Sequence, residues 1–103
     1  MNYYMYSRDE YEKVISVLCE IKGLRREEII KLLKDKECKY LMFLLLKKYG
    51  CVDSGKLKMD FSIQSKKSIN STFKKAEELF LINKQFRELY FRIEELIENR
   101  KTV

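Results

Sequence analysis

The absence of proline from a chain of 103 residues constrains its fold more than any other feature of the sequence. Proline breaks helices and glycine weakens them, and the chain has no proline and only three glycines. Apolar residues recur at helical spacing along most of the chain, and no stretch shows the alternation of a strand. We therefore predict one all-α domain, a compact bundle of about six helices.

A capping box marks the start of the first helix. Ser7 can accept a hydrogen bond from the backbone of the third helical residue, and Glu10 can return one to the backbone of Ser7. The apolar stripe that follows predicts a helix to about residue 21, with Gly23 as its left-handed stop. The stripe consists of Tyr11, Val14, Ile15 and Leu18, with Ile21 as a further candidate. The chain then divides into an N-terminal arm, a domain and a tail: residues 1–6, 7–99 and 100–103.

Two more helices are expected before residue 50. The second spans about residues 25–33, with acids in its first turn and lysines in its last, as the helix dipole favours. The third spans about residues 37–49 and is apolar on nearly all sides from Tyr40 to Leu46, which predicts a central buried helix. The second helix is expected to turn four residues inward: Leu24, Ile29, Ile30 and Leu33.

Residues 54–80 have the pattern of a helix-turn-helix. A short helix over about residues 54–61 leads through a turn to a longer helix that starts near Ser65, a residue suited to cap it. The longer helix has an apolar stripe at helical spacing, formed by Ile69, Phe73, Ala76 and Phe80. Its outward residues are cationic or hydrogen-bonding, with no carboxylate before Glu77: Lys66, Lys67, Asn70, Ser71 and Lys74.

A last helix is expected over about residues 84–99, with Asn83 as its cap. This helix can fold back on the first helix and close the core. It can equally pair with a second copy of the chain, because a heptad-like stripe suits a dimer face. The stripe consists of Phe86, Leu89, Tyr90, Ile93, Leu96 and Ile97.

The excess positive charge is confined to the middle of the chain. Residues 31–75 hold 12 basic and 4 acidic residues, whereas residues 1–30 and 76–103 each hold 5 basic and 6 acidic residues. The net charge of +6 therefore belongs to the elements around the helix-turn-helix. Charge of this density and sign is typical of a surface that binds a polyanion.

The chain lacks the residues that several classes of protein function require. The chain has no histidine, the usual general base near neutral pH, so we expect no enzymatic activity, no cofactor and no small-molecule substrate. Cys19, Cys38 and Cys51 are odd in number and widely spaced, which argues against a disulfide framework or a zinc site. The longest uncharged apolar run is too short to span a bilayer and no signal-peptide core is present, so we expect a cytoplasmic protein with no membrane partner.

The segment CKYLMFLLLKKYGCVDSGKLKMDFSIQSKKSI, residues 38–69, resembles domain IV of the bacterial chromosomal replication initiator DnaA. It can be laid on the family's pattern without gaps, and the flanking helices extend the resemblance to about residues 11–96. Lys39 stands where the family has an arginine that enters the minor groove, and Lys47 where it has one that contacts phosphate. The resemblance implies a Trp-repressor-like helix-turn-helix fold and a bacterial DNA-binding protein in replication control or transcription regulation.

The chain departs from the family at the base-reading signature. Residues 65–69 stand where the family has Asp-His-Thr-Thr-Val, and only the hydroxyl of Ser68 and the β-branched Ile69 correspond. Lys58 replaces the glycine that follows the short helix's isoleucine, and no Gly-x-x-x-x-Gly-Lys-Ser/Thr loop for nucleotide binding is present. The resemblance therefore implies double-stranded DNA as the partner and leaves the target sequence open.

Two groups of DNA-contacting residues are predicted. Asparagine can bond adenine bidentately and lysine can donate to guanine, so we expect the first group to read bases in the major groove: Lys66, Lys67, Ser68 and Asn70. The second group is expected to contact phosphates, with Lys39 entering an adjacent minor groove: Lys39, Lys47, Lys56, Lys58, Ser65, Ser71 and Lys74.

Two alternatives remain open at this point. A protein-interaction or regulatory module that kept the fold but lost sequence-specific readout would account for the missing signature. Such a module would bind an acidic partner or form a homodimer through the C-terminal helix. Three tyrosines could instead stack on the bases of single-stranded nucleic acid, although such tyrosines more often belong to the core: Tyr40, Tyr49 and Tyr90.

Overall fold

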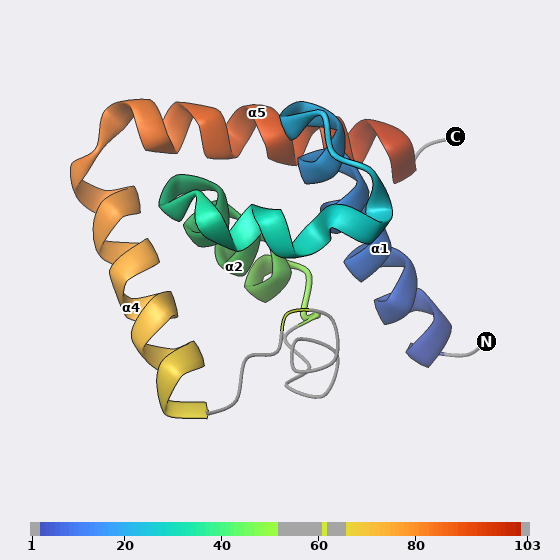
Figure 1. Cartoon of the computed structure of the whole chain (residues 1–103), viewed down its shortest axis with the longest axis horizontal. Coiled ribbons are helices and arrows are strands. Elements are labelled where there is room, and N and C mark those ends of the chain that lie inside the picture. The colour runs from blue at the N-terminus through green and yellow to red at the C-terminus, as the bar shows by residue number, and fades with distance from the viewer. Residues whose placement is uncertain (1–2, 52–60, 62–65, 102–103) are drawn as a thin grey trace.

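The computed structural model describes residues 3–51, 61 and 66–101, and these residues confirm the all-α prediction (Figure 1). They contain no strand and five helices, rather than about six. The additional short helix expected over residues 54–61 lies outside the described residues, except for the buried Phe61. The helices are α1 (Tyr3–Lys22), the 3-10 helix η1 (Arg26–Lys34), α2 (Lys36–Lys48), α4 (Lys66–Ile82) and α5 (Lys84–Lys101).

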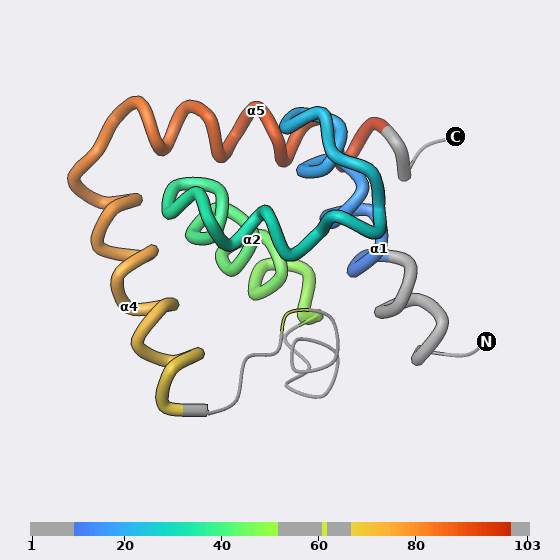
Figure 2. The backbone as a smooth tube through the Cα atoms, viewed as in Figure 1, coloured from blue at the N-terminus to red at the C-terminus, as the bar shows by residue number. Residues whose placement is uncertain are grey.

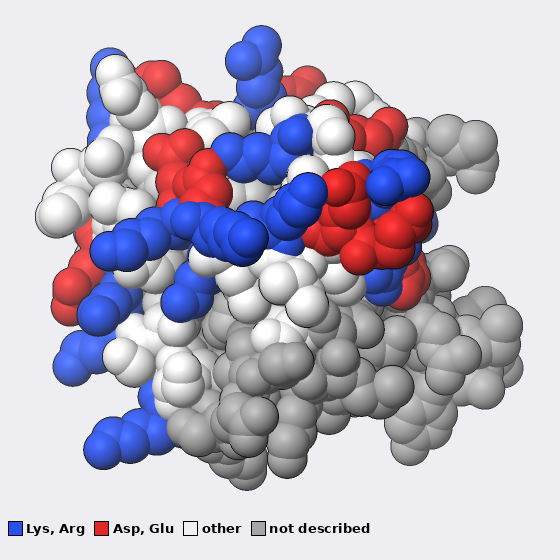
Figure 3. Space-filling model, viewed as in Figure 1, with Lys and Arg blue, Asp and Glu red and all other residues white. Residues whose placement is uncertain are grey.

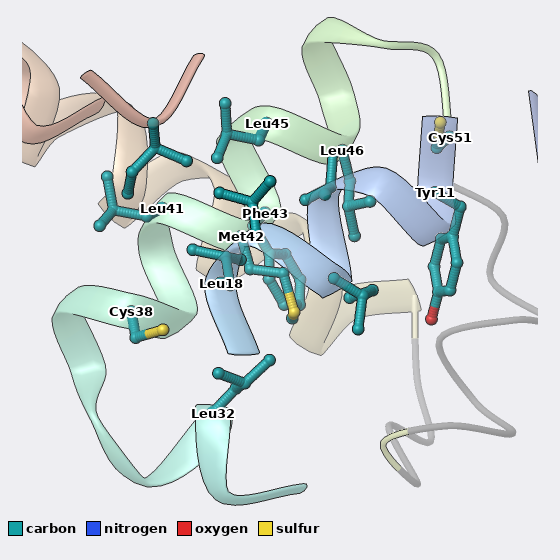
Figure 4. Close-up of a cluster of buried hydrophobic side chains, with 14 of the residues drawn as sticks. Tyr11, Leu18, Leu32, Cys38, Leu41, Met42, Phe43, Leu45, Leu46 and Cys51 are labelled. Carbon is teal, nitrogen blue, oxygen red and sulfur yellow. The ribbon is translucent and has the colours of Figure 1, made fainter. Parts of the chain in front are cut away.

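Helix α2 is the centre of the molecule, as its sequence predicts. It packs against α1, η1, α4 and α5, and its core-facing side chains form one cluster with those of α1 and η1 (Figure 4). The Asp35 carboxylate caps its start by accepting a hydrogen bond from the Cys38 amide, 3.3 Å away. Gly50 ends it at a φ of +68°, a left-handed conformation that glycine adopts at little cost. Its fully buried residues are Leu41, Met42, Phe43, Leu45 and Leu46.

Helix α5 folds back across the molecule and packs on α1, α2 and α4. The chain turns sharply between α4 and α5 (Figure 2), and the Asn83 side chain caps α5 by accepting a hydrogen bond from the Phe86 amide, 2.9 Å away. The predicted stripe is turned into the core, with Phe86, Ile93 and Ile97 at most 1% exposed, whereas Leu96 is 43% exposed. The fold-back arrangement is therefore confirmed, and most of this stripe is not on the surface.

Helix α1 begins at Tyr3, four residues earlier than the capping box predicts. Ser7 therefore lies inside the helix instead of capping it, and residues 3–6 are helical rather than an arm. No proline or glycine occurs before residue 7 to stop the helix from extending upstream. The buried face of α1 is the expected one, with Tyr11, Val14, Ile15 and Leu18 in the core, whereas Ile21 is exposed.

The second helix, η1, is a 3-10 helix, and this changes which residues it buries. Ile30 was expected to face inward, but it is 53% exposed, whereas Leu32 is fully buried. A 3-10 helix has three residues per turn, so Ile29 and Leu32 lie on one face and Ile30 turns away from it. The expectation for Ile30 assumed the 3.6-residue period of an α-helix and was wrong.

We predict that Asn83→Ala lowers the free energy of unfolding by about 1 kcal/mol, because the amide at the start of α5 loses its acceptor. For a chain of this size, the melting temperature should fall by about 4–8 °C in thermal unfolding followed by circular dichroism. Asn83→Ser keeps a capping oxygen and should remain within a few tenths of a kcal/mol of the parent. Equal destabilisation by both substitutions would contradict the capping role.

Candidate nucleic-acid interface

Helix α4 is held against α2 by the predicted apolar stripe. Ala76 is fully buried, Ile69 and Phe73 are 6% and 9% exposed, and Phe80 is half-buried. The rings of Phe73 and Phe43 meet edge to face, with their centroids 5.1 Å apart. This packing fixes the rotation of α4 about its axis, so the opposite face of the helix must point to solvent.

The exposed face of α4 carries the residues that the sequence assigns to DNA contact. Each of them is exposed among the side chains that the structure describes: Lys67, Ser68, Asn70, Ser71 and Lys74. Neither Lys67 nor Lys74 forms an ion pair with any residue in the described ranges, and the same is true of Lys75. The charges of these three ammonium groups are therefore available to a ligand.

Lys47 of α2 lies directly beside this face. Its Nζ atom is 3.5 Å from Oε1 of Glu77 and 5.7 Å from the centre of the Phe73 ring, so it contacts two residues of α4. Lys39 lies eight residues earlier on the same helix, about 12 Å away along its axis. The described ion pairs and ring contacts of α4 include those of Lys47 and none of Lys39.

Part of the predicted site falls on residues whose placement is outside the described ranges. Lys56, Lys58 and Ser65 belong to this part, and so does the side chain of Lys66, the first residue of α4. The helix-turn-helix pairing of residues 54–61 with α4 therefore remains a prediction. What the structure describes is the longer helix and its support by α2.

Three further exposed lysines, which the sequence analysis did not assign to the site, also form no ion pair with any described residue. Lys75 was missed, although it stands next to Lys74 in the same charge run. Lys34 and Lys36 are exposed near the start of α2 and form no ion pair with any described residue. Lys48, by contrast, pairs with Glu94 of α5, which ties the end of α2 to that helix.

Apart from Lys34, the positive charge on η1 and at its start is neutralised locally. Arg26 pairs with Glu12 of α1, and Lys31 and Arg25 both pair with Glu28. The hydrogen bond from Lys31, followed by one from the Arg25 backbone, lowers the pKa of Glu28 to about 2, so this carboxylate stays ionised. Figure 3 shows basic side chains spread over α4 and α2, and acidic side chains gathered with basic ones over η1.

The described residues offer no second site of obvious chemistry. Among them, no group of three or more histidine, cysteine or acidic residues is placed to hold a metal ion. Burial raises the pKa of Cys38 to about 11, which keeps its thiol protonated, and burial together with the hydrogen bond to Glu98 raises the pKa of Tyr49. Of the three tyrosines considered for base stacking, Tyr90 is buried, and Tyr40 and Tyr49 are half-buried.

Comparison of the chain with protein-family models, curated proteins and solved structures found no match. Within the described residues, no helix is both long and apolar enough to cross a membrane. The features that bear on function are therefore the exposed face of α4 and Lys47 of α2 beside it.

The contact between Lys47 and Glu77 gives a prediction about charge at this site. Glu77→Gln should make the protein elute from a heparin column at higher salt than Glu78→Gln does. Both substitutions remove one negative charge, but only the first releases Lys47 from its partner to bind sulfate groups. Equal elution of the two variants would show that Glu77 does not restrain Lys47.

Proposed function

We propose that this protein binds double-stranded DNA, with the N-terminal half of α4 in the major groove. The observation that carries the proposal is a helix anchored by one face, whose opposite face presents exposed lysines without acidic partners among the described residues. A major groove is about 12 Å wide and admits an α-helix. The positive end of the helix dipole also lies at this end of α4 and favours nearby phosphates.

The charge pattern along α4 favours one orientation in the groove. Lys67, Asn70 and Lys74 occupy the first half of the helix, and Glu77 and Glu78 follow them. A duplex approaching the second half would meet two carboxylates, which repel phosphate. The N-terminal half is therefore the part proposed to enter the groove, as it does in helix-turn-helix proteins.

The proposed roles follow from the chemistry of each side chain. Lys67 and Asn70 read base edges together with Ser68, because ammonium and amide groups match the acceptors and donors of the major groove. Lys74, Ser71 and Lys47 contact phosphates on the sides of the groove. The resemblance to DnaA domain IV adds the helix-turn-helix, Lys66, and a role in replication control or transcription regulation to this proposal.

A protein-interaction module is the second candidate. The observation that favours it is the exposure of large apolar residues where α4 meets α5: Leu81 is 75% exposed and Ile82 is 81% exposed. Under this alternative, the lysines of α4 bind no duplex and the protein acts through a partner chain. Binding to DNA is therefore the measurement that separates the two functions.

We predict strong salt dependence of binding to a fluorescein-labelled mixed-sequence duplex. The two proposed lysine–phosphate contacts, those of Lys47 and Lys74, give a log–log slope of about −1.8, so affinity should fall about 12-fold between about 50 and 200 mM salt. Fluorescence anisotropy measures this directly, with Arg92→Ala, an exposed site on α5, as a control that keeps the parent affinity. Absent binding at both salt concentrations would contradict the proposal and favour the protein-interaction module.

Base-reading and phosphate-contacting lysines should differ in a selection from random duplexes. Lys67→Ala should change the preferred sequence, because a donor to base edges is lost. Lys47→Ala should weaken all duplexes alike and leave the preferred sequence unchanged, because a phosphate contact carries no sequence information. An equal loss for selected and random duplexes in Lys67→Ala would refute the base-reading role of this residue.

A further inference from the structure

Lys75 and Glu77 lie on opposite edges of the exposed face of α4. Ala76 stands between them in the chain and is fully buried, and the buried Thr72 and Phe73 lie to either side of it. Successive residues of an α-helix are turned by about 100°, so Lys75 is turned to one side of Ala76 and Glu77 to the other. Because both side chains are exposed, they mark where the exposed face begins and ends.

Lys47 of α2 lies along the Glu77 edge. Its Nζ atom is 3.5 Å from Oε1 of Glu77 and 5.7 Å from the centre of the Phe73 ring, and its side chain is 54% exposed. Lys75, on the opposite edge, forms no ion pair with any residue in the described ranges. Two lysines from different helices therefore flank the face of α4 that is proposed to enter a groove.

The width of such a helix matches the width of a DNA major groove. An α-helix with its side chains is about 10–12 Å across, and the groove is about 12 Å wide. A helix that lies in the groove with its exposed face inward therefore brings its two edges against the two walls. The walls are the phosphate backbones of the two strands, so each edge of α4 meets a different strand.

We propose that Lys47 and Lys75 contact phosphates of opposite strands, so that α4 is clamped between the two backbones of a duplex. This inference rests on the proposed binding of double-stranded DNA. It adds Lys75 as a phosphate contact, and it assigns Lys47 and Lys75 to different strands. A single strand presents no second wall, so the clamp favours a duplex over a single strand.

Salt dependence tests the added contact. Each lysine–phosphate contact contributes about 0.9 to the log–log slope, so with Lys47, Lys74 and Lys75 in contact the slope of the parent is about −2.7. Lys75→Ala should return the slope to about −1.8, in anisotropy titrations of a mixed-sequence duplex between about 50 and 200 mM salt. Lys84→Ala is the matched control, because it removes the same charge from an exposed lysine at the start of α5 and should leave the slope unchanged. A slope that Lys75→Ala leaves unchanged, or that both substitutions reduce equally, would overturn the contact.

Neutralising one strand at a time tests the assignment to opposite strands. A duplex from the selection experiment is prepared with uncharged methylphosphonate linkages in one strand or in the other. Neutralising the strand that Lys75 contacts should abolish the effect of Lys75→Ala and preserve that of Lys47→Ala, and neutralising the other strand should do the reverse. Loss of both effects on the same strand, or of neither effect on either strand, would overturn the clamp.

The failure of the clamp and the failure of the proposed function give different results. A parent that binds no duplex refutes DNA binding and the clamp together. A parent that binds duplex with a slope of about −1.8, unchanged in Lys75→Ala, refutes only the clamp and leaves the proposed function in place.

Discussion

The burial of α2 on all sides is the constraint on which the rest of the structure depends. Fully burying a leucine, phenylalanine or methionine contributes about 1.5–3 kcal/mol, so the five most buried residues of α2 contribute about 8–15 kcal/mol. That sum is as large as the whole net stability of a typical domain, about 5–15 kcal/mol. A helix that is apolar nearly all round cannot remain in water, so α1, η1, α4 and α5 must each cover part of it.

Covering α2 also decides where the positive charge lies. Helix α4 has one apolar stripe, and once Ile69, Phe73 and Ala76 pack inward, the lysines of α4 have no position except the surface. The lysines of α2 stand at its ends because its middle is buried, and Lys47 at the C-terminal end therefore lies beside α4. The cationic surface is thus a consequence of the same packing that stabilises the core, and it needs no separate folding signal.

Sequence reasoning succeeded where the signal was local and periodic. The stripe of α4, the Asn83 cap and the Gly23 stop each depend on residues a few positions apart, and the structure has all three. The prediction that Ile30 faces inward failed, because the choice between a 3-10 and an α-helical turn depends on how η1 fits against α1 and α2. The contact of Lys47 with Glu77 joins residues 30 positions apart, so only the packing of two helices reveals it. The helix-turn-helix remains a prediction, because its first helix falls on residues outside the described ranges.

The exposed face of α4 changes its chemistry along its length, so its two ends suit different kinds of ligand. Asn70, Lys74, Glu77 and Leu81 follow one another at helical spacing and form a single outward stripe. The stripe passes from hydrogen-bonding and cationic, through acidic, to apolar. A polyanion is attracted to the first part and repelled from the second, so it leaves the apolar end uncovered. A protein partner gains most at that apolar end, where water is displaced from Leu81 and its neighbours. Glu77 and Glu78 lie between the two ends, so a polyanion bound at the cationic half would leave Leu81 and Ile82 exposed.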